Sequence, residues 1–105
     1  MAAFVDHLRR ADPSARIIVA GDLNDFGFSA PIRGFTRSTG LLDLPATLPP
    51  RQRYTYDYQG NSEVLDHIMI SRSLAARPHD YDVVHVNAEF HDQTSDHDPS
   101  VLRVR

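Results

Sequence analysis

The sequence predicts one α/β domain over residues 1–105, in which short helices flank a largely antiparallel sheet. Two helical segments enclose one apolar, β-branched run in the first part of the chain. The rest contains three or four β-rich runs, separated by turn residues, and one further helical turn. This order of elements is typical of layered α/β folds. The length suits one compact domain with a modest core.

The first part of the chain is expected to form two helices around one strand. Ala2–Ala11 carries apolar residues at helical spacing. Arg16–Ala20 reads RIIVA, a continuous apolar run typical of a strand that is buried on both faces. Ser29 is a suitable N-cap and Gly40 a suitable stop, so the sequence predicts a helix over Ala30–Thr39.

The second part is expected to be mainly β-structure. Leu41–Arg53 is Pro-rich and has no regular pattern. The runs that follow are rich in aromatic and β-branched residues, and a turn at residues 59–61 separates the first two. The predicted strands are Tyr54–Tyr58, Val64–Ser71, Tyr81–Asn87 and Val101–Val104, with one helical turn at Ser73–Ala76.

Composition and charge exclude several classes of protein. The net charge of −3 argues against nonspecific nucleic-acid binding through a general basic field. All eleven basic residues are arginine, which suits bidentate phosphate contacts but is equally explained by genome composition. The absence of cysteine excludes disulfides and thiolate metal sites. No apolar run approaches the roughly 18 residues of a membrane helix, and the chain shows no signal-peptide pattern, so we expect no membrane partner and leave the localisation open.

The segment VLDHIMIS places a carboxylate in an apolar row. Alternate residues of a strand share a face, so Asp66 lies with Ile68 and Ile70, whereas His67 and Met69 point the other way. A buried, unpaired carboxylate is costly, so Asp66 should have an imidazole or guanidinium partner. The alternative is that Asp66 begins the strand at a position that water reaches.

Two further segments carry polar groups where strands end or begin. In GDLND, Asp22 offers an acceptor and Asn24 an amide that can donate to a phosphate oxygen, at the rim of a sheet where ligands bind. The alternative, favoured by this segment alone, is an Asx-turn. In SDHDP, Asp96 can bind a hard cation and His97 can present an imidazole to substrate or water, although such loops are often only solvated turns.

The three segments GDLND, LDHIMIS and SDHDPSV, in this order and spacing, resemble the endonuclease/exonuclease/phosphatase family of the DNase I-like superfamily. The resemblance extends from Arg16 to Val104. It implies half of a DNase I-like layered β-sandwich and a metal-dependent phosphodiester hydrolase, with a nuclease that acts on nucleic acid as the expected type. FSAPIRGF, RYTYDYQGNSEVLDHI and VHVNAEFHDQTSDHDP are similar to the predicted bacterial extracellular nucleases, which implies a secreted bacterial protein.

The resemblance also implies roles for individual residues. Asp22 would align the attacking water, and Asn24 would hold a nonbridging phosphate oxygen. Asp66 would bond His97 and fix its tautomer. His97 would face the scissile phosphate as hydrogen-bond donor or general base. Asp96 would contribute to a divalent metal site, for which Mg²⁺ is the expected ion and Mn²⁺ or Ca²⁺ are alternatives.

The resemblance covers only the C-terminal half of the family's fold. The N-terminal half normally brings an Asn, a metal-binding Glu and a further His, and neither Glu63 nor Glu89 lies in a matching motif. The activity of the isolated chain is therefore in question, and we expect a second copy or an N-terminal half to cover the exposed sheet face. Alternative functions are a noncatalytic remnant or binding module of the same fold, or a phosphatase that acts on phosphorylated small molecules or lipids. His67 is expected to pack rather than to catalyse.

Overall fold

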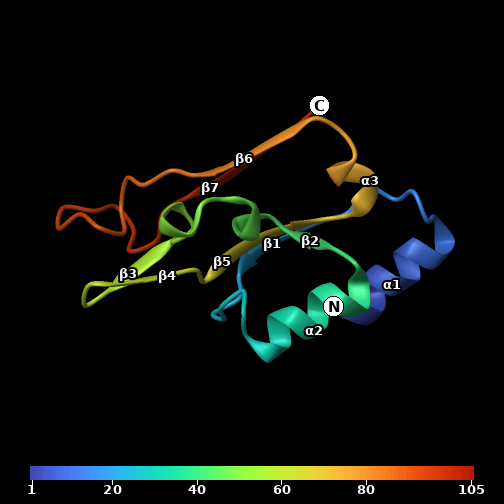
Figure 1. Ribbon diagram of the computed structural model, residues 1–105, viewed down its shortest axis with the longest axis horizontal. Coiled ribbons are helices and arrows are strands. Elements are labelled where there is room, and N and C mark those ends of the chain that lie inside the picture. The colour runs from blue at the N-terminus through green and yellow to red at the C-terminus, as the bar shows by residue number, and fades with distance from the viewer.

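The computed structural model describes residues 1–105 and has the predicted α/β architecture, with antiparallel sheets and short helices (Figure 1). A central sheet has the strand order β1-β5-β2, and each of two further sheets is a pair of strands. The central strands are β1 (Ile18–Asp22), β5 (Asp66–Ile70) and β2 (Leu42–Asp43). The pairs are β3 (Tyr56–Tyr58) with β4 (Asn61–Glu63), and β6 (His79–Val83) with β7 (Ser100–Val104).

Two ten-residue helices form at the predicted bounds, α1 at Ala2–Ala11 and α2 at Ala30–Thr39. The Ser29 hydroxyl accepts from the backbone N–H of Ile32, and Gly40 ends α2 in the left-handed region with φ 67°. The shorter elements are α3 (Arg72–Ala75) and the 3₁₀ turns η1 (Leu44–Thr47) and η2 (Pro50–Gln52). None of these helices has the length and apolar character needed to cross a membrane.

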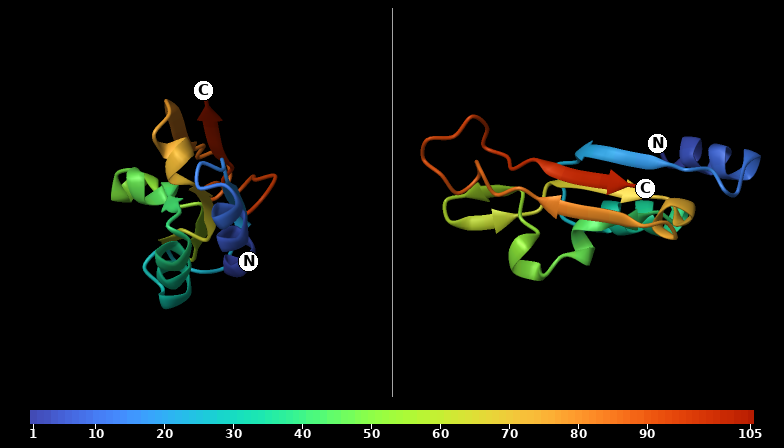
Figure 2. Two further views of the ribbon diagram at one scale, coloured as in Figure 1. Left: turned by 90° about the vertical axis from the view of Figure 1, so that its right-hand side faces the viewer. Right: turned by 90° about the horizontal axis from the view of Figure 1, so that it is seen from above.

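The two faces of β5 enter different apolar clusters. Met69 packs with Val5 of α1 and Ile32 of α2 on one face. Ile70 packs with Leu44 and Leu74 on the other, and Ile68 and Leu102 join that cluster. The β6–β7 pair therefore lies on the side of the central sheet opposite α1 and α2 (Figure 2). This arrangement confirms the predicted alternation along residues 66–70.

The prediction of a strand buried on both faces at Arg16–Ala20 is wrong in burial and shifted in position. The observed β1 runs from Ile18 to Asp22 and contains no buried residue, and Ile18 is 49% exposed. β1 is an edge strand, and only its Val19 side packs against the helices. The apolar run correctly indicated a β-strand. It did not indicate how much of the strand's surface is covered by the rest of the chain.

Two short strands were missing from the prediction. β2 occupies two residues of the segment expected to be irregular, and β4 reads NSE, which carries no apolar pattern. β4 forms because Gln59 and Gly60, with φ 51° and 82°, make a tight turn that folds the chain back on β3. The turn itself was predicted. Its geometry, rather than side-chain burial, creates the second strand.

The strand predicted at Tyr81–Asn87 ends early, at Val83. The backbone after Val83 forms hydrogen bonds to the buried carboxylate of Asp98 instead. Its Oδ1 accepts three backbone N–H groups, those of Val86, Asn87 and Ala88, at 3.1, 2.8 and 2.9 Å. Because these N–H groups bond Asp98, they are not available for the hydrogen bonds of a β-ladder. The segment that reads VHV is therefore a loop.

Candidate active site

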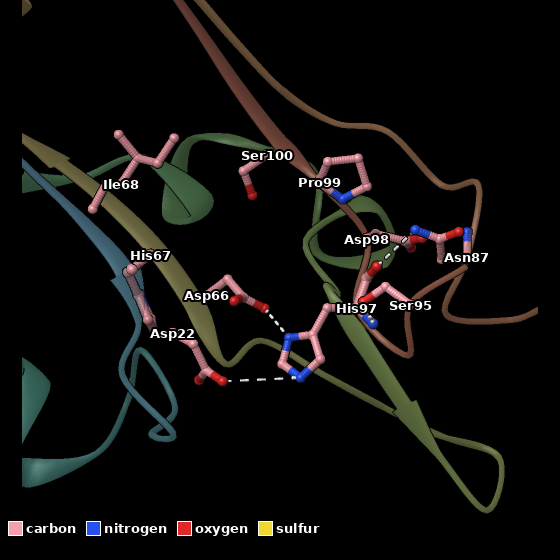
Figure 3. A pocket seen from close by; sticks show the side chains of 12 residues that line it. Asp22, Asp66, His67, Ile68, Asn87, Ser95, His97, Asp98, Pro99 and Ser100 are labelled. Atoms are coloured by element: carbon pink, nitrogen blue, oxygen red, sulfur yellow. Dashed lines mark hydrogen bonds and ion pairs between the residues drawn. The ribbon is translucent and has the colours of Figure 1, made fainter. Parts of the chain in front are cut away.

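An open cavity of about 410 Å³ lies where β1 ends and β5 and β7 begin. The side chains of Asp22, Asp66 and His97 converge on it from three separate parts of the chain (Figure 3). Asn87, Ser95 and Ser100 also line it. Only two of its twelve lining residues are hydrophobic, which suits a charged ligand better than an apolar one.

The two carboxylates reach the cavity because they form a cross-strand pair. Asp22 is the last residue of β1 and lies opposite Asp66, the first residue of β5, in the antiparallel register. Directly opposite residues share a face of the sheet, so both side chains point the same way. Like charges in this position are unfavourable, and a positively charged group close to both carboxylates would offset their repulsion.

His97 lies between these carboxylates. Its Nδ1 is 2.6 Å from Asp66 Oδ2, and its Nε2 is 4.0 Å from Asp22 Oδ2 (Figure 3). With a carboxylate accepting at Nδ1, that nitrogen carries the proton and Nε2 is left to face the cavity. Burial alone would lower the pKa of His97, but the hydrogen bond to Asp66, followed by the charges of Asp66, Asp22 and Asp96, raises it above its ordinary value.

The backbone of His97 is fixed by neighbours on both sides. It forms an isolated antiparallel bridge with Tyr56, and the two rings lie 5.0 Å apart between centroids. The Asn87 side-chain amide donates to the His97 carbonyl at 3.0 Å, and the Ser95 hydroxyl accepts from the His97 N–H at 3.1 Å. The imidazole is therefore held before any ligand arrives.

Thr55 connects the two partners of the His97–Asp66 hydrogen bond. This residue is completely buried. Its hydroxyl accepts from the backbone N–H groups of Leu65 and Asp66, each at 3.2 Å. Its carbonyl accepts from the N–H of Asp98, the residue after His97, at 2.7 Å. One residue thus positions both the strand that carries Asp66 and the loop that carries His97.

Asp98 serves the architecture of the same loop. It is 2% exposed, and beyond its three backbone bonds its Oδ2 lies 2.9 Å from His85 Nδ1. Burial would raise its pKa, but the N–H of Ala88, the imidazole of His85 and the remaining backbone donors together lower it. The His85 ring also stacks on Tyr54 at 4.0 Å. Asp98 therefore anchors the loop as a buried, ionised carboxylate.

Two predicted site residues do not reach the cavity. Asn24 has φ 49°, and its backbone N–H donates to Asp22 Oδ1 at 2.9 Å, which is the Asx-turn that the sequence left as the alternative. Asp96 is exposed and belongs neither to the cavity lining nor to the carboxylate–imidazole cluster. Asp22, expected to align water, does lie in that cluster. The roles predicted for Asn24 and Asp96 stay predictions.

His67 behaves as expected for a packed residue. It is 1% exposed, and its Nδ1 lies 3.0 Å from both Asp43 oxygens. Its Nε2 is 2.8 Å from the carbonyl oxygen of Asp25. Burial would lower the pKa of His67, but the hydrogen bonds to Asp43 and to the Asp25 carbonyl raise it. His67 thereby ties the loop after Asp22 to β2.

Sequence reasoning missed several residues that position the site. They are Thr55, Tyr56, Asn87 and Asp98. These residues contact partners that are distant in the sequence; Asp98, for example, is 10 to 12 residues from the backbone N–H groups that it accepts. The alternating tyrosines before the Asp66 strand were a visible signal for Tyr56. The buried Thr55 had no comparable signal.

The donor set fits a divalent cation. Asp22, Asp66 and His97 each offer one ligand atom, and these atoms all lie within 4.8 Å of one another. Carboxylate oxygens are the donors that hard cations prefer, and an imidazole nitrogen is compatible with several divalent metals. The negative charge of the cross-strand carboxylate pair attracts a cation to this cluster.

The model of the endonuclease/exonuclease/phosphatase family matches residues 3–97. The chain belongs to this family. No curated protein and no solved structure matches it. Endonuclease/exonuclease/phosphatase proteins are in general metal-dependent hydrolases of phosphate esters, and the fold described above is consistent with part of their DNase I-like β-sandwich.

Proposed function

We propose that this endonuclease/exonuclease/phosphatase chain supplies the phosphodiester-hydrolysing site of a nuclease. One observation carries the proposal. His97 is bonded at Nδ1 to Asp66 at 2.6 Å, while its Nε2 faces both Asp22 and the open cavity. A carboxylate-oriented imidazole beside a second carboxylate is suited to proton transfer at an anionic ester.

Each predicted residue has a place in this proposal. His97 contacts the scissile phosphate through Nε2, as a hydrogen-bond donor or as general base. Asp66 acts through His97 by holding its tautomer and stabilising the imidazolium. Asp22 accepts from the attacking water and aligns it. Asn24 donates its amide to a nonbridging oxygen, which requires its side chain to turn toward the cavity from the Asx-turn.

A divalent ion completes the proposed site. Mg²⁺ suits it because Mg²⁺ prefers oxygen ligands, retains several waters and often needs only one or two carboxylates; Mn²⁺ and Ca²⁺ are alternatives. When bound, the ion supplies charge neutralisation at the phosphate. Asp22 and Asp66 are the first candidates to hold it, because both belong to the carboxylate–imidazole cluster. Asp96 would contribute directly or through water.

The proposed substrate is a nucleic acid, and the proposed setting is a secreted bacterial protein. The support for both is the similarity of FSAPIRGF and the two longer segments to bacterial extracellular nucleases. The cavity residues alone serve phosphodiesters and phosphomonoesters equally well. Turnover of a phosphomonoester but not of a nucleic acid would therefore favour the phosphatase alternative.

We also propose that a second copy of the chain or an N-terminal half covers the exposed sheet face. β1 is an edge strand, and Ile18 on it and Val101 on β7 are 49% and 50% exposed. Unpaired strand edges and exposed apolar residues favour association. Light scattering should show a dimer, or a complex with an added N-terminal half; a chain that stays monomeric at high concentration and binds no such half contradicts this proposal.

The experiment for hydrolysis compares wild type with His97→Ala on plasmid DNA and on bis-p-nitrophenyl phosphate, with Mg²⁺, Mn²⁺ or Ca²⁺. We expect turnover by wild type and a loss of roughly a hundredfold or more in His97→Ala. His7→Ala, an exposed histidine on α1, is the matched control and should retain full activity. No turnover in any sample would favour the noncatalytic alternative for this chain.

A further inference from the structure

Tyr56 and Tyr58 form a row of aromatic rings that leads away from the cavity. The Tyr56 ring lies 5.0 Å from the ring of His97, between centroids. The Tyr58 ring lies 6.3 Å beyond it, with only 9° between the two ring planes. Alternate residues of β3 share one face, so the row follows the strand outward from the proposed phosphate position.

We infer that Tyr56 and Tyr58 are a stacking surface for an unpaired nucleobase adjacent to the phosphate at His97. The inference rests on the proposed function and deepens it, because it assigns a preference for single-stranded or locally opened nucleic acid. Bases of single strands stack on such aromatic rows without regard to sequence, since every base has a π-face.

Packing within the hairpin does not account for the exposed ring. Tyr58 is 53% exposed and belongs to neither apolar cluster. The residues opposite Tyr56 and Tyr58 on β4 are Glu63 and Asn61, both polar, so no apolar cross-strand partner covers the tyrosines. A large aromatic side chain held parallel to its neighbour and open to solvent is available for a flat ligand.

The charges around the row favour a neutral ring over a phosphate. Glu63 lies opposite Tyr56 in the β3–β4 ladder, and Asp96 precedes His97, which forms a bridge with Tyr56. Burial raises the pKa of Tyr56 most, and the charges of Asp96 and Glu63 raise it further. These acids repel a phosphate but accept hydrogen bonds from the N–H groups of a base. The base therefore belongs on the tyrosines, and the phosphate belongs at the cavity, where a divalent cation held by Asp22 and Asp66 would offset their charge.

The test measures binding without relying on turnover. A short fluorescein-labelled oligothymidylate is titrated with wild-type chain and followed by anisotropy, in EDTA and again with Mg²⁺. The variant Tyr58→Leu removes the exposed ring, and we expect its Kd to rise roughly tenfold. Tyr58→Phe keeps the ring and should bind like wild type. Phe4→Leu changes an aromatic residue on α1 that is 64% exposed and should also bind like wild type.

An abasic strand of equal length separates base stacking from backbone binding. It should bind wild type at least as weakly as oligothymidylate binds Tyr58→Leu, because it has no base for either tyrosine. Equal affinity of wild type and Tyr58→Leu, or no binding of oligothymidylate to wild type, overturns the inference. If base binding depends on Tyr58 but no His97-dependent hydrolysis is found, only the proposed function is contradicted. Binding and hydrolysis are measured independently.

Discussion

Asp22 and Asp66 lie directly opposite each other at the end of the β1–β5 ladder, with both carboxylates on the same face of the sheet. The Oδ1 atom of Asp22 also accepts the N–H of Asn24, so this carboxylate is held toward its neighbour. The proposed site therefore concentrates negative charge at the end of the ladder, where like charges directly opposite each other are unfavourable.

The variant Asp22→Asn should stabilise the chain while reducing hydrolysis. The amide keeps an oxygen for the Asn24 N–H but removes one charge of the pair, which should raise the free energy of unfolding by about 0.2–1 kcal/mol. Urea denaturation in EDTA measures the gain. An unchanged or lower stability would show that His97 already balances both carboxylates.

Divalent ions should stabilise the wild-type chain more than Asp22→Asn. An ion that binds only the folded state stabilises it by about 2.7 kcal/mol at a free concentration one hundred times its Kd. Thermal denaturation with and without Mg²⁺ measures the difference. Equal shifts in the two proteins would place the ion away from Asp22.

Asp66→Asn should lower hydrolysis by roughly a hundredfold or more while leaving the fold intact. The amide oxygen can still accept from His97 Nδ1, and the Asp66 N–H keeps its bond to Thr55. A neutral amide does not stabilise an imidazolium, so proton transfer at Nε2 becomes less favourable. Hydrolysis rates measure the loss of activity, and circular dichroism checks that the fold is intact. An equally active variant would remove the proposed role of Asp66.

Asp98→Asn should lose about 1–3 kcal/mol of stability, because one side of the buried group turns from acceptor to donor toward His85. The three backbone bonds to Oδ1 can survive, so the loop should loosen rather than unfold. Urea denaturation gives the loss. Asp92→Asn, an exposed change in the same loop, is the control and should have no effect.

The His67–Asp43 pair should make stability fall as the pH rises. The folded-state pKa of His67 is raised, so its contribution is complete below the unfolded value of about 6.5 and is lost as the pH rises through the folded value. The groups that face it are the Asp43 carboxylate and the Asp25 carbonyl, with the charge of Asp66 nearby. Denaturation midpoints between pH 6 and pH 9 test the slope.

The variant Asp43→Ala leaves the imidazole without its carboxylate and should cost about 3 kcal/mol at neutral pH. It should also remove the His67 part of the pH slope over the same range and leave the part that comes from His97, whose pKa is raised as well. A wild-type slope that persists in Asp43→Ala would assign it to another group.

The sequence was sufficient where the determinants are local. The bounds of α2 follow from Ser29 and Gly40, and the alternation of β5 follows from its own residues. The bond between Asp66 and His97, 31 residues apart, was expected through the family resemblance rather than from either segment. The early end of β6 was not predictable, because it depends on a carboxylate 15 residues beyond Val83. The exposure of Ile18 depends on neighbours in space, which periodicity does not report.

Thr55 has a consequence for motion. Because it bonds both the start of β5 and the residue after His97, bending of the β3–β4 hairpin carries the imidazole and its carboxylate along together. Their short contact should then survive bending of the hairpin. In an NMR spectrum, the imidazole Nδ1 proton would keep a single, strongly downfield resonance.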